Sequence, residues 1–363
     1  MIAARRIRVL IVDDSAVVRK VLSESLGKYP DIEVVGTATD PYVARDRILE
    51  LAPDVLTLDV EMPRMDGLSF LEKLMRSRPM PVVIVSSITP AQSEAAVRAL
   101  ALGAVEVVSK PGSAYSVPEV GQRLVHAIRA AATARLSRAQ TPPRGVPVVG
   151  AAPGLPSAAS ILTRVQTTHR VLAIGASTGG TKAIEAVLQE LPATTPGTVI
   201  VQHMPAGFTA SFAKRLDQLC AMEVREARDG DAVVPGVALV APGGLHMMMQ
   251  RSGAALQVRI KDGPPVHHQR PAVDVLFNSV ARTMGCNAVG VILTGMGADG
   301  ARGLLAMREA GAHTIAQDEH SCVVFGMPKE AIELDAADEV LPLSRVAHGI
   351  ASALAEARAG AGV

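Results

Sequence analysis

The chain has few cysteines and almost no net charge. Its 363 residues include three cysteines, Cys220, Cys286 and Cys322, which form neither a disulfide framework nor a CxxC metal pair. We therefore expect a reducing, cytoplasmic environment. The formal net charge of +1 gives no overall field that would favour binding to nucleic acid or to an anionic membrane.

Long apolar runs are also missing. No stretch of about 20 apolar residues occurs, so we expect no insertion into a membrane. Basic residues precede an apolar run at the N-terminus, as in a signal peptide, but that run soon meets Asp13 and Asp14. Hydrophobic residues still make up 48% of the chain, enough for substantial cores, and the length suggests two domains.

Short apolar segments alternate with amphipathic ones from residue 7 to about residue 130. The apolar segments predict strands buried on both faces: IRVLIVD, IEVVGTA, VLTLDV, PVVIVSS and VEVVSK. The amphipathic segments predict helices over residues 15–26, 42–51, 68–76 and 92–102 and around 123–134. Five such βα units indicate a doubly wound parallel sheet with helices on both faces.

Residues 131–168 differ in composition from the segments on either side. Five prolines interrupt any helix, small residues dominate, and four dispersed arginines occur without any Asp or Glu. This composition is typical of a flexible tether. A basic arm for nucleic acid is the alternative, but it would need aromatic residues among the arginines.

A second alternating region runs from residue 169 to about residue 356. The segments VLAIGAS, TVIVQHM and AVGVILTG predict buried parallel strands, each followed by helical sequence. Between residues 223 and 261 the chain is richer in Gly and Pro, and VALVAPGG and LQVRIK suggest β-hairpins added to the α/β core. The whole chain is therefore expected to be α/β, with two domains joined by a tether.

Acidic residues follow the predicted strands of the first domain. Asp13 and Asp14 close the first strand, Asp59 closes the third and Lys110 closes the fifth. Open α/β sheets place their sites at these strand ends, so the groups should meet. Crowded carboxylates repel one another, and a hard cation such as Mg²⁺ relieves that repulsion while it holds phosphate oxygens. One such aspartate alone would be read as a helix N-cap.

Residues 6–130 resemble the receiver domain of bacterial response regulators. The matching segments are VDDSAVVRK, LDVEMPRMDG, VSS and SKPG. The resemblance implies that Asp59 accepts a phosphoryl group, and that Ser86 and Lys110 contact it. It also implies that Asp13, Asp14, Asp59 and the backbone carbonyl of Glu61 hold Mg²⁺. A cis peptide bond between Lys110 and Pro111 is implied as well.

Ser177 in IGASTGG fits the G-x-S-x-G pattern, which is informative only between a strand and a helix. Both are predicted here. A nucleophilic serine needs a base and an orienting acid, and His203 and Asp299 each follow a predicted strand at the same sheet edge. Each of the three has a simpler interpretation as a helix N-cap or a loop residue. The glycine-rich turn GMGADG offers backbone N–H groups for an oxyanion hole.

The order of these residues differs from that of a standard α/β-hydrolase. That fold runs serine, acid, histidine, whereas Ser177, His203 and Asp299 run serine, histidine, acid. Three histidines after Asp299 keep the hydrolase order open: His313, His320 and His348. None of these three ends an apolar strand that is followed by a loop.

Residues 169–356 look like the catalytic domain of the chemotaxis protein-glutamate methylesterase (CheB) family. The matching segments are IGASTGG, VQHMPAGFTASFAKRLD, APGGLHM, HHQRPAVDVLF, LTGMGADGARG and FGMPKEAI. The resemblance implies Ser177 as nucleophile, His203 as general base and Asp299 as its orienting carboxylate. The backbone at Met296 and Thr178 would line the oxyanion site, and Arg270 is the candidate substrate contact. The neighbouring His267 and His268 lack metal-ligand spacing and are expected to be solvated loop residues.

The two resemblances together imply a phosphorylation-controlled hydrolase. Its substrates would be methylated glutamates of chemoreceptors, with deamidation of receptor glutamines as a second activity. A chemotaxis histidine kinase would supply the phosphoryl group, and the protein would be cytoplasmic and recruited to receptor arrays. No cofactor is expected in the catalytic domain. The alternatives are a receiver-linked esterase for small molecules and a non-enzymatic docking or transcription module, although no helix-turn-helix is visible.

Overall fold

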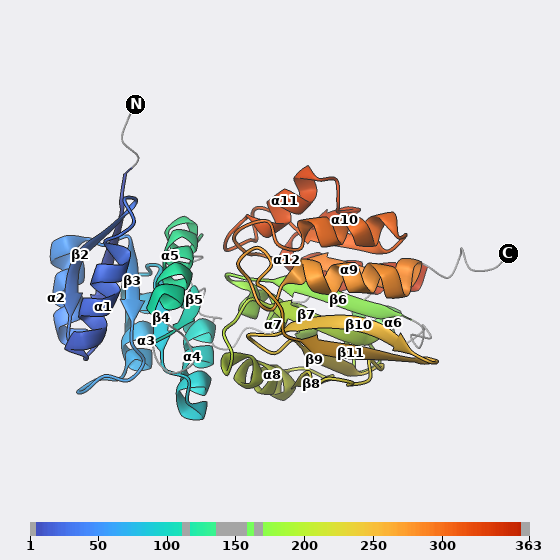
Figure 1. Ribbon diagram of the computed structural model, residues 1–363, viewed down its shortest axis with the longest axis horizontal. Helices are drawn as coiled ribbons and strands as arrows, with labels where there is room; N and C mark the ends of the chain where they lie inside the picture. The colour runs from blue at the N-terminus through green and yellow to red at the C-terminus, as the bar shows by residue number, and fades with distance from the viewer. Residues whose placement is uncertain (1–4, 111–116, 136–157, 163–169, 357–363) are drawn as a thin grey trace. The chain divides into compact units, whose positions relative to one another are not determined.

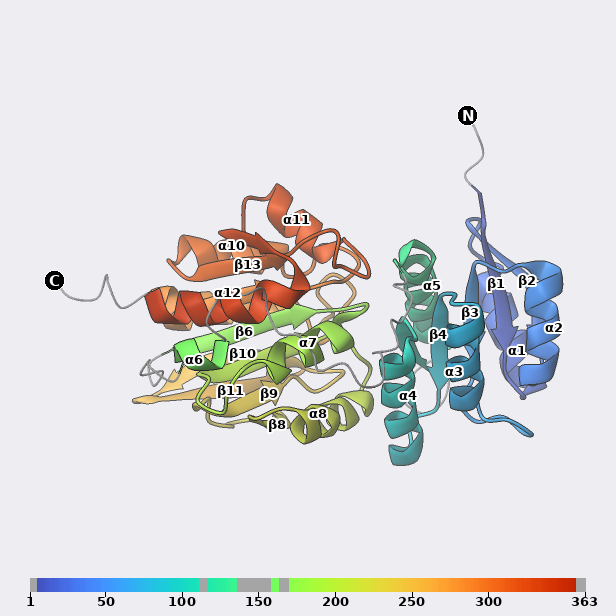
Figure 2. The same ribbon diagram turned by 180° about the vertical axis from the view of Figure 1, so that it is seen from behind.

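The computed structural model describes residues 5–110, 117–135, 158–162 and 170–356 (Figure 1; Figure 2). The chain divides into two compact units, residues 1–141 and 142–363. Among the described residues, no helix combines the length and the apolar character needed to cross a membrane.

The first unit is built on one parallel sheet with the strand order β2-β1-β3-β4-β5. The strands are β1 (Ile7–Val12), β2 (Ile32–Ala38), β3 (Val55–Leu58), β4 (Val82–Ser86) and β5 (Glu106–Ser109). In such an order the chain reverses direction across the sheet at β1 and β3, and ligands bind beyond the carboxyl ends of the strands at that point. The predicted doubly wound sheet is confirmed.

Four helices connect these strands and a fifth follows β5; all lie within a few residues of the predicted ranges except that α5 begins six residues earlier. They are α1 (Ala16–Leu26), α2 (Pro41–Leu51), α3 (Gly67–Ser77), α4 (Pro90–Leu102) and α5 (Val117–Thr133). Polar caps set several starts, because Asp40 accepts the amides of Tyr42 and Val43, and Asp66 accepts that of Ser69. Side chains of α1 and α5 pack together on the sheet in one buried cluster.

The second unit contains a seven-stranded parallel sheet with the order β14-β13-β12-β6-β7-β9-β8. Its strands are β6 (Val171–Ala176), β7 (Gly197–Gln202), β8 (Glu223–Glu226), β9 (Val237–Val240), β12 (Ala288–Ile292), β13 (His313–Gln317) and β14 (Glu339–Leu341). The helices are α7 (Gly180–Gln189), α8 (Phe208–Leu219), α9 (Val273–Met284), α10 (Ala301–Glu309), α11 (Met327–Glu333) and α12 (Leu343–Glu356). A parallel α/β core is thus confirmed here too.

The prediction of hairpins in the second unit is right for one segment and wrong for the other. Strands β10 (His246–Ser252) and β11 (Ala255–Lys261) form an antiparallel hairpin. The segment VALV, in contrast, is β9, which lies between β7 and β8 in the parallel sheet. Its last three residues are fully buried, as expected of a strand covered on both faces, and this apolar run distinguishes it from a hairpin strand.

The predicted tether also contains ordered structure at both ends. Helix α5 continues to Thr133, with Ala131 buried against the first sheet. Near the other end, α6 (Ala158–Leu162) packs against α12 and buries Leu162 completely. The rest of residues 131–168, from 136 to 157 and from 163 to 168, lies outside the described residues.

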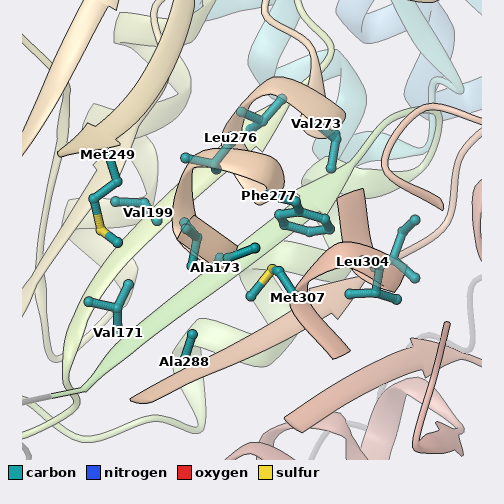
Figure 3. Close-up of a cluster of buried hydrophobic side chains, with 14 of the residues drawn as sticks. Val171, Ala173, Val199, Met249, Val273, Leu276, Phe277, Ala288, Leu304 and Met307 are labelled. Carbon is teal, nitrogen blue, oxygen red and sulfur yellow. The ribbon is translucent and has the colours of Figure 1, made fainter. Parts of the chain in front are cut away.

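The core of the second unit positions the start of α9 beside β6. Figure 3 shows Leu276 and Phe277 of α9 with Ala173 and Met307 in one buried cluster. The close packing continues to the strand end, because a Cβ atom at Gly175 would lie 2.2 Å from the side chain of Val273. Only glycine fits there, so the N-terminus of α9 can approach the carboxyl end of the sheet.

Candidate active site

The first candidate site is a buried cluster of charges at the carboxyl ends of β1, β3 and β5. Lys110 Nζ lies 2.6 Å from Asp59 Oδ2 and 2.8 Å from Asp13 Oδ2. Burial alone would lower the pKa of Lys110, but its ion pairs with the two aspartates outweigh that effect and raise it. Burial also raises the pKa of Asp59, against the opposing effect of Lys110. The structure therefore brings together three residues that the sequence places 46 or more positions apart.

This cluster has the donor set of a site for a hard divalent cation. Carboxylate oxygens of Asp13, Asp14 and Asp59 lie within 4.8 Å of one another, and Asp14 is exposed. The amide of Glu61 donates to Asp59 Oδ1 at 3.3 Å, which places the residue whose carbonyl was predicted as a ligand beside the carboxylate. Oxygen donors in this arrangement suit Mg²⁺.

The other predicted features of the phosphoryl site, Ser86 and the bond between Lys110 and Pro111, have no described contact with Asp59. Ser86 ends β4 and is 1% exposed, and its hydroxyl lies 3.5 Å from the carbonyl of Ser87. Among the described residues it makes no hydrogen bond to Asp59. The predicted cis bond between Lys110 and Pro111 falls on a residue outside the described part of the chain.

The second candidate site is centred on Ser177, on the turn between β6 and α7. Its amide donates to Thr294 O at 3.0 Å, and its carbonyl accepts from the amide of Gly180 at 2.7 Å. The turn requires glycine at position 179, where φ is +79° and a Cβ would lie 2.6 Å from Val323. The simpler interpretation of Ser177 as an N-cap is wrong, because the N-cap of α7 is Gly179 and no side chain caps this helix.

His203 lies beside Ser177 because the strands fix it there. Ala176 pairs with Gln202 in the register of β6 and β7, and the amide of His203 donates to Ala176 O at 3.1 Å. The Nε2 atom of His203 lies 2.7 Å from Asp299 Oδ2, and both side chains are buried. The other ring nitrogen, Nδ1, is buried and has no hydrogen-bond partner in the described parts of the chain.

Asp299 is held as a carboxylate by groups from two elements. Its Oδ2 also accepts the amide of Val273 at 2.7 Å, and its Oδ1 accepts the amide of Asp274 at 3.0 Å. Burial acts to raise the pKa of Asp299, but the bond to His203 and these two amides outweigh it and lower the pKa. Asp299 does not cap its own helix, because Gly300 is the N-cap of α10 and α10 has no side-chain cap.

Sequence reasoning missed Gln202, which ties the serine and the histidine together. Its side-chain amide donates to Ser177 O at 2.8 Å and to His203 O at 3.2 Å, and the residue is 3% exposed. A glutamine at the end of the apolar segment TVIV is a signal that could have indicated this role, since buried polar side chains need partners.

The predicted oxyanion residues adjoin Ser177, whereas the side-chain contacts of Arg270 lie in its own loop. Thr178 is buried and its carbonyl accepts the hydroxyl of Thr294 at 3.0 Å. Met296 follows Gly295, where a Cβ would lie only 2.7 Å from Ser177 Cβ, so this loop passes directly against the serine. Arg270 instead donates to Gly263 O at 2.7 Å and to the carboxylate of Asp262, within its own loop.

The other histidines occupy different places. His313 begins β13, at the opposite sheet edge from Ser177, and pairs with Glu339 at 2.8 Å. His267 has a carboxylate neighbour that sequence reasoning did not find, because its Nε2 lies 3.0 Å from Asp274 Oδ2. His268 is exposed, as predicted.

Comparisons with known proteins agree on both halves of the chain. The family model for the response regulator receiver domain matches residues 9–119, and that for the CheB methylesterase matches residues 172–350. A protein-glutamate methylesterase/protein-glutamine glutaminase of Syntrophus aciditrophicus is 56% identical over 95% of this chain and 98% of its own length. A protein-glutamate methylesterase/protein-glutamine glutaminase of Salmonella typhimurium is 55% identical over 94% of this chain and 95% of its own length.

A solved structure resembles the second unit. The crystal structure of the Thermotoga maritima CheB methylesterase catalytic domain matches with a TM-score of 0.50 and 38% sequence identity. The match covers 51% of this chain and 98% of that domain.

Proposed function

Because this chain belongs to the family of receiver-linked protein-glutamate methylesterases/protein-glutamine glutaminases, we propose that it hydrolyses methyl esters on glutamate side chains of chemoreceptors. Deamidation of receptor glutamines follows the same route, since esters and amides pass through similar tetrahedral intermediates. The receiver unit makes the activity responsive to phosphorylation. As the substrate is a receptor, the enzyme works at receptor arrays on the cytoplasmic side.

In the proposed reaction, the hydroxyl of Ser177 attacks the ester carbonyl and His203 takes its proton. The observation that carries this role is the pattern of contacts of the His203 ring. Its Nε2 atom bonds to Asp299, whereas its Nδ1 atom is buried with no hydrogen-bond partner in the described residues. The proton therefore goes to Nδ1, while the carboxylate of Asp299 stabilises the imidazolium that forms. His203 then protonates the leaving methanol.

The second half of the reaction uses the same groups. Water loses a proton to His203 Nδ1 and attacks the acyl-enzyme, and the serine leaves with a proton returned to its oxygen. Negative charge develops on the substrate oxygen in both steps. The backbone amides of Met296 and Thr178 are the proposed donors to that oxygen, because both residues adjoin Ser177 in the fold. Arg270 remains a proposed contact for substrate.

In the receiver unit, Asp59 is the proposed acceptor of a phosphoryl group from a chemotaxis histidine kinase. Asp13, Asp14, Asp59 and the Glu61 carbonyl would hold Mg²⁺, which when bound neutralises charge on the phosphoryl oxygens. Lys110, already within 2.8 Å of both Asp13 and Asp59, compensates the negative charge of the product, and Ser86 is the proposed hydroxyl contact.

The test is methanol release from membranes that contain methylated receptors. Ser177→Ala in the full chain should reduce the rate by several orders of magnitude. Ser252→Ala, at the exposed end of β10, is the matched control and should keep the normal rate. A near-normal rate for Ser177→Ala would contradict the assignment. Turnover of small esters but not of receptors by the native chain would favour the small-molecule esterase instead. Turnover of neither substrate by the native chain would favour a docking role.

A further inference from the structure

Two buried carboxylates join the N-termini of α9 and α10 in a reciprocal way. Asp299, just before α10, accepts the first amides of α9, from Val273 at 2.7 Å and Asp274 at 3.0 Å. Asp274, in the first turn of α9, accepts the amide of Gly303 in the first turn of α10 at 2.7 Å. Helix N-termini favour anions, so the start of α9 stabilises the carboxylate of Asp299 and the start of α10 stabilises that of Asp274.

This arrangement places a second negative charge behind the His203–Asp299 pair. One oxygen each of Asp274 and Asp299 lie within 4.8 Å of one another, and the residues are 6% and 2% exposed. Burial and the charge of Asp299 raise the pKa of Asp274, whereas His267 acts to lower it. Among the described residues, the charged groups that face Asp274 are Asp299 from the loop before α10 and His267 from the loop before α9.

His267 contacts the pair formed by Asp274 and Asp299 from the solvent side. Its Nε2 lies 3.0 Å from Asp274 Oδ2, and its side chain is 38% exposed. The backbone holds it there in the left-handed region with φ of +51°, which non-glycine residues seldom adopt. Backbone in that region often persists where surrounding structure requires a particular side-chain direction.

We propose that Asp274 and His267 are positioning residues that set the basicity of His203 through Asp299. The proposal rests on the proposed function only for its effect on catalysis. Asp274 fixes the amide that binds Asp299 Oδ1, and its negative charge favours the protonated form of His203. His267 holds the side chain of Asp274 and, when protonated, offsets that charge. The buried base is in this way connected to a titratable group at the surface.

The direct test is a titration of the His203 ring proton by NMR in the full chain, with the signal assigned by its loss in His203→Asn. Asp274→Asn keeps an oxygen for the amide of Gly303 but removes the charge. A unit charge about 8 Å away in a medium of effective dielectric about 20–40 changes a pKa by about one unit. We therefore expect the His203 titration to move down by about one pH unit in Asp274→Asn.

The histidine variants give the opposite sign and a matched control. His267→Gln keeps a donor to Asp274 but has no positive charge. The midpoint of the His203 titration should therefore move to higher pH if His267 is protonated in the wild type in that pH range. His268→Gln, at the neighbouring exposed position with a similar φ of +62°, should leave the titration unchanged. A His203 titration that is equal in wild type and Asp274→Asn would overturn the proposal.

Kinetics on methylated receptor membranes separate this proposal from the proposed function. For Asp274→Asn, the acidic limb of kcat/KM should follow the His203 titration downward, and KM should stay the same. A role in folding alone would lower kcat without moving the limb. If Ser177→Ala retains activity while the His203 titration still shifts in Asp274→Asn, the proposed function fails and the positioning proposal stands.

Discussion

Replacing Gln202 by methionine is predicted to damage catalysis more than it damages stability. Methionine has a similar length but cannot donate hydrogen bonds, so both carbonyl contacts of the amide are lost. Ser177 O keeps its bond from the amide of Gly180, whereas His203 O loses its only described partner. The Oε1 atom of Gln202 has no hydrogen-bond partner among the described residues, so nothing is lost on that side.

The expected cost in stability is small. One buried acceptor left without a donor costs about 1–3 kcal/mol. Removing an unpaired buried oxygen offsets part of this, which leaves a net loss of about 1–2 kcal/mol in the free energy of unfolding. For a unit of this size, that lowers Tm by about 2–8 °C. Activity depends instead on the relative placement of Ser177 and His203, and a shift of about 1 Å costs on the order of 100-fold in rate.

The assay compares Gln202→Met with Thr198→Val, a change in the same strand away from the site. Thr198 is fully buried, and its hydroxyl donates to Pro196 O at 2.9 Å, so its loss should lower Tm by a similar amount. Methanol release from methylated receptors should fall about 10- to 100-fold in kcat for Gln202→Met and stay normal for Thr198→Val. Equal kcat values in the two variants would refute the proposed coupling of the two carbonyls to catalysis.

Four further predictions concern the loop at Ser177, the receiver unit and a fragment without that unit. Gly295→Ala should abolish methanol release, because its Cβ would lie 2.7 Å from Ser177 Cβ; Gly121→Ala, which meets only ordinary contacts, serves as the control. Asp59→Asn, or removal of Mg²⁺ from the native chain, should prevent phosphorylation by a small phosphodonor, measured by mass spectrometry; an unchanged stoichiometry would place the acceptor elsewhere. Burial raises the pKa of Asp59 in the folded state, so the native chain loses stability as pH rises from the unfolded-state pKa of Asp59 to its folded-state pKa. Asp59→Asn should therefore have the higher Tm at pH about 7 and an equal Tm at acid pH. A fragment that begins near Thr168 should release methanol faster than the unphosphorylated full chain, because a tethered receiver is at high effective concentration near the esterase; equal rates would exclude occlusion.

The sequence predicted those features that depend on local pattern. Strands buried on both faces read as continuous apolar runs, and the residue after each run falls at the carboxyl edge of the sheet. For this reason the amino-acid pattern alone is enough to name Asp59 and Lys110 as neighbours, and likewise His203 and Asp299. At VALV the same apolar pattern favours a buried parallel strand, but the Gly and Pro residues on either side suggested a hairpin, and the strand is parallel.

The sequence could not predict the partners of polar side chains that lie away from the strand ends, nor which atoms of a predicted pair meet. The carboxylate of Asp274 depends on the packing of α9 against α10, and no local spacing shows that Gly303 donates to it. The orientation of the His203 ring is of the same kind, since either nitrogen can face an acid. Only the fold shows that Nε2 faces Asp299 and that Nδ1 is buried with no hydrogen-bond partner among the described residues.

The unusual order of the proposed triad follows from strand order and not from different chemistry. The sheet has the order β12-β6-β7, so the loops after β12 and β7 flank the turn that carries Ser177. Asp299 comes from the first of these loops and His203 from the second, and their side chains meet at 2.7 Å. A base and its acid need only meet in space, and the connections between the strands decide which of them comes first in the chain.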